Sequence, residues 1–396
     1  MIAKRIEAIS ESPTIKLTEI VKRLKAEGHE IIELNIGEPD LPTPDLIKEA
    51  GISAITNNNT KYTINAGTTE LRQEICNKLK KENGIDYNIN EIIVSNGAKQ
   101  AIFNAVMSLV NPGDEVIIPA PYYVSYPEIV NIAEGKSVII HGDPSNQLKP
   151  KSEDIAKAIT SKTKMLILCN PNNPTGAVFS KTELEEIAEI IIKNKVYVLI
   201  DEIYEKLVYD NKQFISFPTI DKRLKEYTIL VNGASKSFAM TGWRMGFAAA
   251  PKEIISAMNK LQSQTTSNAS TISQYAAYNA YKFQSTQMGY MVKEFEQRRN
   301  LFYQELKKNE KLEIQISEGA FYLFPNVSKY FGTSYNQYKI NNSSDLCKYI
   351  LETVKVAIVP GSAFGVEGYI RIAYTIDKTK IKKAAELIQT ALSKLI

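Results

Sequence analysis

The sequence contains few of the residues on which several common kinds of site depend. Its 396 residues include three cysteines, Cys76, Cys169 and Cys347, which are odd in number, lie far apart and form no CxxC pair. The sequence therefore predicts neither a disulfide framework nor a metal site. The only histidines are His29 and His141. Both are interpreted as structural or solvent-facing residues, so no catalytic triad of the Ser-His or Cys-His type is favoured.

Long apolar runs and a large excess of one charge are also absent. No segment approaches the ~20 apolar residues that a membrane span needs, and the first seven residues lack the apolar core of a secretory signal. Lys and Arg number 48 against 44 Asp and Glu, and the lysines are spread along the chain without forming a run. We therefore expect a cytoplasmic protein whose partners include neither a membrane nor a nucleic acid.

The length and the hydrophobic pattern predict two domains, because 396 residues exceed the ~250 to 300 at which a single core stops growing. A composition of 44% hydrophobic and 23% charged residues is ordinary for a soluble globular enzyme. Short β-branched runs occur at residues 92–94, 116–118, 138–140, 165–168, 196–200, 228–231 and 245–249. Most are separated by stretches able to form helices, which indicates an α/β fold with a mainly parallel sheet between helices.

The pattern changes beyond about residue 285. A long charged helix is predicted at residues 291–308, and short strand-like runs and a terminal helix follow it. This part is interpreted as a second, smaller α+β domain. We predict an N-terminal arm that contributes to the small domain (1–45), a large domain (46–285) and a small C-terminal domain (286–396).

Two basic residues stand in an unusual place, between the apolar runs at 228–231 and 245–249. Residues 232–244 read Asn-Gly-Ala-Ser-Lys-Ser-Phe-Ala-Met-Thr-Gly-Trp-Arg, so Arg244 lies eight residues after Lys236. Buried Lys and Arg are rare unless a partner holds their charge, and an anion is therefore expected beside them. A desolvated lysine has a lowered pKa and can condense with a carbonyl group. The planar fork of an arginine suits a phosphate.

Three further motifs follow predicted strands. Residues 95–100, Ser-Asn-Gly-Ala-Lys-Gln, lead into a helix, and the N-terminus of a helix attracts anions. Residues 170–176, Asn-Pro-Asn-Asn-Pro-Thr-Gly, follow a second strand, and Asp201 and Tyr204 follow a third. Each motif alone is also typical of a plain turn or helix cap. Because the carboxyl ends of parallel strands meet at one edge, we expect all three near Lys236.

Taken in order, these motifs resemble the fold-type I pyridoxal-phosphate enzymes and, among them, class I of the aspartate aminotransferase superfamily. The similarity covers nearly the whole chain, from residues 37–39, Gly-Glu-Pro, to residues 371–374, Arg-Ile-Ala-Tyr. It is nearest to the branch in which an active-site lysine binds the distal carboxylate of the substrate. The resemblance implies a pyridoxal 5′-phosphate cofactor, a homodimer, and a large domain with a seven-stranded, mainly parallel sheet.

The resemblance also implies the catalytic roles. Lys236 would form the Schiff base with the cofactor and act as the base of the proton transfer. Asp201 would pair with the protonated ring nitrogen of the cofactor, because a buried anion keeps that nitrogen charged. Tyr204 would bind the ring oxygen of the cofactor.

The binding residues follow from the same resemblance. The cofactor phosphate would be held by the backbone of Ala98 and Lys99, by Ser235 and Arg244, and by Tyr62 from the other subunit. From the residues alone, Tyr62 is almost as readily interpreted as half-buried at a core edge.

The remaining predicted positions concern the substrate and the cofactor ring. Arg371 would bind the substrate α-carboxylate, helped by Asn173 and the Gly37 backbone, with Asn173 also touching the cofactor. Tyr123 would stack on the cofactor ring. Relatives often have Trp at this position, and some have Ser where Gly233 stands, so one phosphate contact would be missing.

Lys99 carries the prediction of substrate. A cation in the first turn of a helix is slightly unfavourable, which calls for a compensating anion. In the branch that this sequence resembles, a lysine here recognises the distal carboxylate of aspartate or glutamate. Enzymes of that branch that accept prephenate tend to have a basic residue before the Pro-Ser of the arm, whereas residues 10–13 here read Ser-Glu-Ser-Pro.

The sequence therefore predicts an aspartate aminotransferase that converts L-aspartate and 2-oxoglutarate into oxaloacetate and L-glutamate. An aromatic or prephenate aminotransferase of the same family is the alternative, and C–S lyases and other fold-type I branches also compete. A non-catalytic regulator that binds the cofactor is less favoured, because no helix-turn-helix pattern precedes residue 30.

Overall fold

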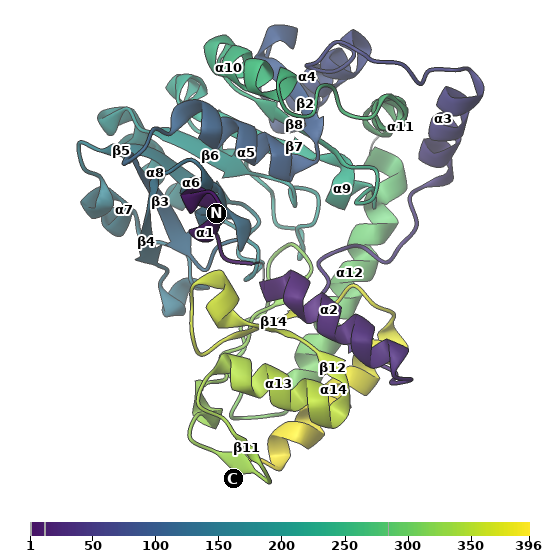
Figure 1. The fold of residues 1–396 in the computed structure, drawn as a ribbon, viewed down its shortest axis with the longest axis vertical. Helices are drawn as coiled ribbons and strands as arrows, with labels where there is room; N and C mark the ends of the chain where they lie inside the picture. Colours follow the sequence, from purple (N-terminus) through teal and green to yellow (C-terminus); the bar gives the residue numbers. More distant parts are fainter. Residues whose placement is uncertain (1, 12, 284) are drawn as a thin grey trace.

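The computed structural model describes residues 2–11, 13–283 and 285–396. Its upper part in Figure 1 is built on a seven-stranded sheet in the order β2-β8-β7-β6-β5-β3-β4. The strands are β2 (Ile92–Asn96), β3 (Glu115–Ala120), β4 (Lys136–His141), β5 (Thr163–Cys169), β6 (Tyr197–Asp201), β7 (Thr228–Gly233) and β8 (Met245–Ala249). Only β8 runs antiparallel to its neighbours in this sheet, so the predicted mainly parallel seven-stranded sheet is confirmed.

The strand sequences explain which strands lie inside. The inner strands β7 and β8 are buried at every position and consist mostly of apolar and small residues. The edge strand β4 has no buried residue, and its positions are exposed or half-buried.

Helices cover this sheet on both faces (Figure 1). They are α3 (Asp45–Thr56), α4 (Thr69–Asn83), α5 (Ala98–Leu109), α6 (Ser125–Ile132), α7 (Ser152–Ala158), α8 (Lys181–Asn194), α9 (Ala234–Ser237), α10 (Lys252–Ser263) and α11 (Thr271–Lys282). α5 packs across β2, β8 and β7, while α11 packs against α3 and α4. Thr68 caps α4 by accepting a hydrogen bond from the Leu71 N–H, as the capping pattern predicts.

The lower part of Figure 1 is a smaller group of helices around short strands. It contains α12 (Ser285–Leu306), β9 (Tyr322–Leu323), β10 (Ser334–Tyr335), β11 (Tyr338–Lys339), α13 (Ser343–Val354), β12 (Val356–Ala357), β13 (Val359–Pro360), β14 (Ile370–Ala373) and α14 (Lys378–Ser393). The strands β13, β14 and β9 form an antiparallel sheet. α12 runs from the upper part into the lower one (Figure 1).

The N-terminal segment contributes to this lower part. It contains α1 (Lys4–Glu7), α2 (Pro13–Ala26) and β1 (Ile32–Glu33), and β1 pairs with β12 in a parallel arrangement. The apolar face of α2 packs through Val21 on Leu351 and Ala357. The strand-like run at 313–316 makes only an isolated bridge, between Glu313 and Asn326. The domain boundaries near residues 45 and 285 stay predictions.

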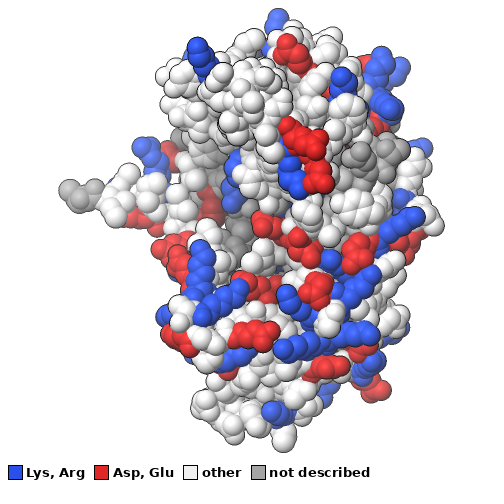
Figure 2. All heavy atoms as spheres, turned by 90° about the vertical axis from the view of Figure 1, so that its right-hand side faces the viewer, with Lys and Arg blue, Asp and Glu red and all other residues white. Residues whose placement is uncertain are grey.

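Charge on the surface is mixed in sign. Figure 2 shows Lys and Arg interleaved with Asp and Glu over the face drawn there, most densely over its lower half. None of the described helices combines the length and the apolar character that crossing a membrane requires.

Candidate active site

A cavity of about 580 Å³ lies at the carboxyl edge of the large sheet. The strands β2, β5, β6 and β7 run parallel and end at this edge, and β8 begins there because it runs the opposite way. Residues that precede β8 and residues that follow the other strands are thus brought together. The lining includes most of the predicted site residues: Gly37, Ala98, Lys99, Tyr123, Asn173, Asp201, Tyr204, Ser235, Lys236, Arg244 and Arg371.

Lys236 lies on α9 immediately after β7, with its amine in the cavity. Its Nζ donates a hydrogen bond to the Gly37 carbonyl at 2.6 Å and lies 5.6 Å from the centre of the Phe321 ring. Burial lowers the pKa of Lys236 to about 8, against an opposing effect of Glu38, and Arg244 and Arg371 lower it further. The amine is therefore available in its neutral, nucleophilic form near neutral pH.

Asp201 ends β6 and is buried, with only 5% of its surface exposed. Its Oδ2 accepts a hydrogen bond from the Tyr126 hydroxyl at 2.9 Å, and its Oδ1 accepts one from the Ile203 N–H. Burial raises the pKa of Asp201 to about 6, although the Tyr126 hydrogen bond and Lys236 act in the opposite direction. A cationic group bound in the cavity would restore its charge.

Arg244 reaches the beginning of α5. Its backbone lies in the left-handed region, with φ of 53°, and its Nη1 donates to the Thr241 carbonyl. A Cβ on Gly97 would lie 2.5 Å from Arg244 Nη2, and a Cβ on Gly246 would lie 2.2 Å from the Ala98 nitrogen. Glycine at these two positions therefore allows the guanidinium and the helix N-terminus to approach each other.

The first N–H groups of α5 are left for a ligand. Gly97 is the N-cap residue and offers no side-chain cap. Ser235 also lines this end of the cavity. A helix N-terminus and an arginine on the same wall form an arrangement that suits an anion such as a phosphate.

Arg371 lies in β14, on the other side of the cavity, and is buried. Its Nη1 donates to Asn173 Oδ1 at 3.2 Å and its Nη2 to the Asn35 carbonyl at 2.7 Å. Its Nε is buried and has no partner among the described residues, and the same holds for both side-chain polar atoms of Asn35. A buried guanidinium that lacks a carboxylate partner is expected to receive one from a ligand.

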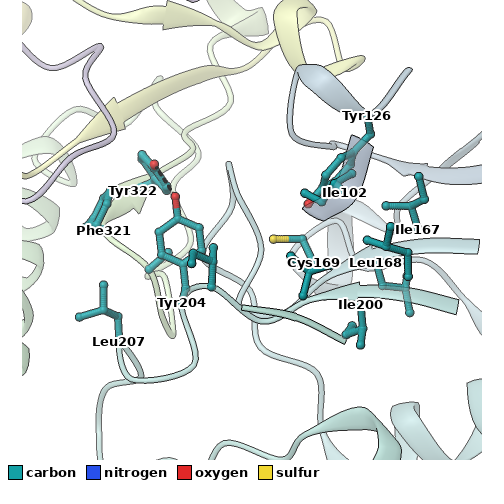
Figure 3. Packing of buried hydrophobic residues seen from close by; sticks show 14 of the residues in the cluster. Ile102, Tyr126, Ile167, Leu168, Cys169, Ile200, Tyr204, Leu207, Phe321 and Tyr322 are labelled. Atoms are coloured by element: carbon teal, nitrogen blue, oxygen red, sulfur yellow. Dashed lines mark hydrogen bonds between the residues drawn. The ribbon is translucent and has the colours of Figure 1, made fainter. Parts of the chain in front are cut away.

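Two tyrosines meet between these walls. Figure 3 shows the Tyr204 hydroxyl pointing at Tyr322, and the two oxygen atoms are 2.8 Å apart. Cys169 lies between Tyr204 and Tyr126 in the same view, and its thiol donates a hydrogen bond to the Pro171 carbonyl at 3.2 Å. Burial raises the pKa of the Cys169 thiol well above its usual range. Tyr126 and Tyr322 are site residues that sequence reasoning missed.

The positions of Lys99, Tyr123 and Tyr62 complete the comparison with the sequence. Lys99 Nζ lies 5.5 Å from the centre of the Tyr123 ring, and both side chains line the cavity. Tyr62 does not line it, because its side chain is 91% exposed on the outer surface. Within one subunit, Tyr62 is therefore not part of the site, and the alternative of a half-buried core position is wrong.

The residues present fit a ligand with two anionic ends and a cationic ring nitrogen. Four basic side chains line the cavity, Lys99, Lys236, Arg244 and Arg371, and none of them forms an ion pair among the described residues. Arg244 and Arg371 belong to opposite walls, and of the two lining carboxylates Asp201 is buried whereas Glu38 is exposed. This distribution leaves room and charge for a phosphate at one end and a carboxylate at the other.

The fold and the cavity define an enzyme of the fold-type I transferase class. Residues 29–388 match the family of class I and II aminotransferases. The chain is 42% identical to the aspartate/prephenate aminotransferase of Nitrosomonas europaea, over 99% of this chain and 100% of that protein. It is 40% identical to the aspartate aminotransferase of Bacillus subtilis, over 99% of both chains. A solved structure of the aspartate aminotransferase from Rhizobium meliloti superimposes with a TM-score of 0.97 at 40% identity, covering 100% of both chains.

The chain belongs to the class I and II aminotransferases. The recognised family, the fold class and the enzyme class predicted from the sequence are confirmed by these comparisons.

Proposed function

We propose that this aminotransferase transfers the amino group of L-aspartate to 2-oxoglutarate, with pyridoxal 5′-phosphate as its cofactor. The observation that carries the proposal is the half-buried Lys236 amine, which shares one cavity with Asp201 and with two arginines that lack carboxylate partners. Pyridoxal 5′-phosphate, when bound, supplies a carbonyl carbon that accepts the amino group and a ring that withdraws electrons from the reacting carbon.

The wall formed by α5 and Arg244 would hold the phosphate. The N–H groups of Ala98 and Lys99, the Ser235 hydroxyl and the Arg244 fork would be its ligands, and the close approach of Arg244 to Gly97 supports this assignment. Asp201 would hold a proton on the ring nitrogen, and that positive charge would lower the pKa of the carboxyl group again. Tyr204 would donate its hydroxyl proton to the ring oxygen.

Lys236 would have two tasks. Its neutral amine would be the nucleophile that attaches the cofactor, and the same amine, once released, would act as the base that takes up the proton of the substrate α-carbon and moves it during the transfer. The Gly37 carbonyl, 2.6 Å from Nζ, orients the amine while it is protonated. Burial favours loss of that proton, so Lys236 can serve as a base near neutral pH.

Residues from both sides of the cavity would bind the amino acid. Arg371 would grip the α-carboxylate with its fork, with Asn173 and the Gly37 backbone beside it. Tyr123 would cover one face of the cofactor ring, and Lys99, close to Tyr123, would receive the distal carboxylate of aspartate. These roles give a dicarboxylic substrate two charged anchors and a neutral amino acid only one.

Prephenate is the second candidate acceptor, because the Nitrosomonas europaea relative carries both substrates in its name. The arm at residues 10–13 lacks the basic residue expected for prephenate, and Ser12 lies outside the described residues. We therefore favour aspartate with 2-oxoglutarate. A cytoplasmic homodimer with domains 1–45, 46–285 and 286–396 belongs to the same proposal.

The test is a comparison of amino donors on purified, cofactor-loaded protein. The visible absorbance band of the cofactor is followed as aspartate, glutamate, alanine or phenylalanine is added, and each released 2-oxo acid is identified. Aspartate and glutamate should discharge the band at the highest kcat/KM. Prephenate is then offered as acceptor in place of 2-oxoglutarate. Equal use of alanine and aspartate would reject the proposed substrate, and release of a thiol or ammonia without amino transfer would reject the reaction.

A further inference from the structure

Tyr322 touches both walls of the cavity. It lies in β9 and is 1% exposed. Its hydroxyl is 2.8 Å from the Tyr204 hydroxyl, as Figure 3 shows, and the two rings lie edge to face with 5.9 Å between their centres. Its ring lies under the guanidinium of Arg371, with 4.5 Å between the ring centre and Cζ. One side chain thus contacts a residue assigned to the cofactor and a residue assigned to the substrate.

The hydroxyl pair has a fixed direction once a ligand is bound. A phenol carries one proton, so Tyr204 can donate to an acceptor in the cavity only if Tyr322 donates to Tyr204. Hydrogen bonds in such a chain polarise each other, which makes Tyr204 a stronger donor than it would be alone. Burial raises the pKa of both phenols, so both protons are present at neutral pH.

The ring of Tyr322 acts on Arg371. The guanidinium contacts two aromatic rings, those of Tyr322 and of Phe364, the second at 4.9 Å. Its hydrogen bonds to Asn173 and Asn35 involve only Nη1 and Nη2. Aromatic faces attract a cation without neutralising it, so the rings fix the plane of the fork while its charge remains available.

Gly37 shows how closely Tyr322 is held. A Cβ at residue 37 would lie 2.2 Å from the Tyr322 hydroxyl oxygen. The loop whose carbonyl accepts the Lys236 hydrogen bond therefore packs directly against this hydroxyl. A side chain at residue 37 would displace Tyr322 from both of its neighbours.

We propose that Tyr322 is a positioning residue with two separable parts. Its hydroxyl strengthens Tyr204 as a donor to the ring oxygen of the cofactor, and its ring orients Arg371 for the substrate carboxylate. The inference rests on the proposed function, because it assigns a cofactor oxygen to Tyr204 and a carboxylate to Arg371.

Two variants separate the two parts. Tyr322→Phe keeps the ring and removes the hydroxyl, whereas Tyr322→Leu removes both. Tyr349→Phe is the control, because Tyr349 is also buried and its hydroxyl donates to the Ala391 carbonyl, away from the cavity. Each holoenzyme is measured twice: by a pH titration of its visible cofactor band, and by binding of succinate, a dicarboxylate that cannot react.

A hydrogen bond donated to the ring oxygen stabilises its negative charge and favours the deprotonated form of the bound cofactor. Both Tyr322 variants should therefore shift the titration midpoint to higher pH, by roughly 0.3 to 1 unit. Succinate binding should weaken roughly 3- to 30-fold in Tyr322→Leu only. Tyr322→Phe should bind succinate within about 2-fold of the unaltered enzyme, and the Tyr349→Phe control should change neither readout.

The outcomes that overturn the proposal are distinct from failure of the proposed function. An unshifted midpoint in Tyr322→Phe removes the role of the hydroxyl. If Tyr322→Phe and Tyr322→Leu lose succinate binding equally, the ring does not orient Arg371, and Tyr322 contributes only to packing. An unaltered protein that develops no pH-dependent cofactor band would instead reject the proposed function, whatever the variants do.

Discussion

The protonation state of the Lys236 amine determines whether this cavity offers a nucleophile. Lys236 is surrounded by the Gly37 carbonyl, the Phe321 ring and two arginines, and it lacks an ion-pair partner among the described residues. With its pKa lowered to about 8, roughly a tenth of the amine is neutral at pH 7. At the ordinary pKa of 10.5, the neutral fraction would be roughly 300-fold smaller.

This pKa predicts how the cofactor-free protein captures pyridoxal 5′-phosphate. Only the neutral amine attacks a carbonyl, so the capture rate should rise with pH and level off near pH 8. The rate is measured by absorbance between pH 7 and 10 with free cofactor in excess. A rate that keeps rising tenfold per pH unit up to pH 10 would mean that Lys236 titrates as an exposed lysine.

We propose that Lys99 is the residue that separates dicarboxylic from neutral substrates. A charge-assisted contact contributes ~1.5 to 3 kcal/mol, so Lys99→Ser should lower kcat/KM for aspartate by roughly 10- to 150-fold. Alanine, which has no distal carboxylate, should be spared. Lys382→Ser, an exposed lysine on α14, serves as the matched control. An equal decrease of kcat/KM for aspartate and alanine would show that Lys99 does not bind the distal carboxylate.

At the scale of elements, the strands and their ends could be predicted from the sequence, whereas side-chain partners could not. Every apolar run predicted between residues 92 and 249 forms a strand in the structure. Short runs of branched apolar residues that are bounded by turn residues are typical of buried strands. α3, α10 and α11 were not predicted. α11 (Thr271–Lys282) includes Ser, Tyr and Asn residues, which favour a helix only weakly. Its helical conformation is therefore stabilised by packing against α3 and α4.

The missed site residues illustrate the same limit. Tyr126 lies in α6 and Tyr322 in β9, and both side chains are fully buried tyrosines that look like core residues in the sequence. Only the three-dimensional arrangement brings the first to Asp201 and the second to Tyr204. The one available signal in the sequence was that each tyrosine lies in an apolar run, because the hydroxyl of a buried tyrosine usually needs a hydrogen-bond partner.

The loop after β6, which carries Tyr204, is anchored by buried carboxylates. Glu202 accepts hydrogen bonds from the Ser216 hydroxyl at 2.6 Å and from the Phe217 N–H at 2.9 Å. Glu205 pairs with Lys78 of α4 in a nearly dry environment. Burial raises the pKa of Glu202 from its ordinary 4.5 to about 8, with the Ser216 hydrogen bond acting against this shift and the nearby Glu205 contributing to it.

This raised pKa predicts that the cofactor-free protein loses stability as the pH rises from 4.5 to 8. Between pH 4.5 and 8 the folded state holds a proton on Glu202 that the unfolded state has lost, so stability falls as pH rises, by at most about 5 kcal/mol. Glu202→Gln should flatten this part of the profile, measured as the urea midpoint from pH 4.5 to 9. Glu189→Gln, which changes an exposed carboxylate, should leave it unaltered. Parallel profiles for Glu202→Gln and the unaltered protein would contradict the assignment.

At the scale of the whole molecule, the cavity lies between two parts that ion pairs tie together. Arg298 of α12 binds Asp40, in the loop that follows Gly37, at 2.6 Å. Arg299 is fully buried and forks onto Asp210 with distances of 2.7 and 2.8 Å. These contacts connect the long helix to loops beside the site, so the two walls of the cavity keep a defined separation.

The outer surface near α3 bears on the proposed homodimer. Tyr62 and Ile64 are strongly exposed, as are Ile52 and Ile55 on α3. A second subunit covering these side chains would remove apolar surface from water. It would also give Tyr62 the role that one subunit alone does not provide.

A hybrid dimer tests that role. One subunit carries Tyr62→Phe and the other carries Lys236→Ala, so the only working lysine belongs to the first subunit. If Tyr62 serves the site of the other subunit, this lysine meets an unaltered tyrosine, and the hybrid should show half the activity of the normal dimer with normal cofactor affinity. Cofactor affinity weakened roughly 10-fold or more, as in the Tyr62→Phe homodimer, would place Tyr62 outside the partner site.

The most direct test of the whole account is the Lys236→Ala protein, measured in a single half-reaction. Cofactor-loaded protein is mixed with aspartate, and the loss of the visible band and the appearance of oxaloacetate are followed together. Because the change removes the proton-transferring amine, the rate should fall by at least ~10²- to 10⁴-fold. Added methylamine, which supplies a small free base, should restore part of it. A Lys236→Ala protein that forms oxaloacetate at a rate near that of the unaltered enzyme would contradict the assignment of Lys236 and the mechanism built on it.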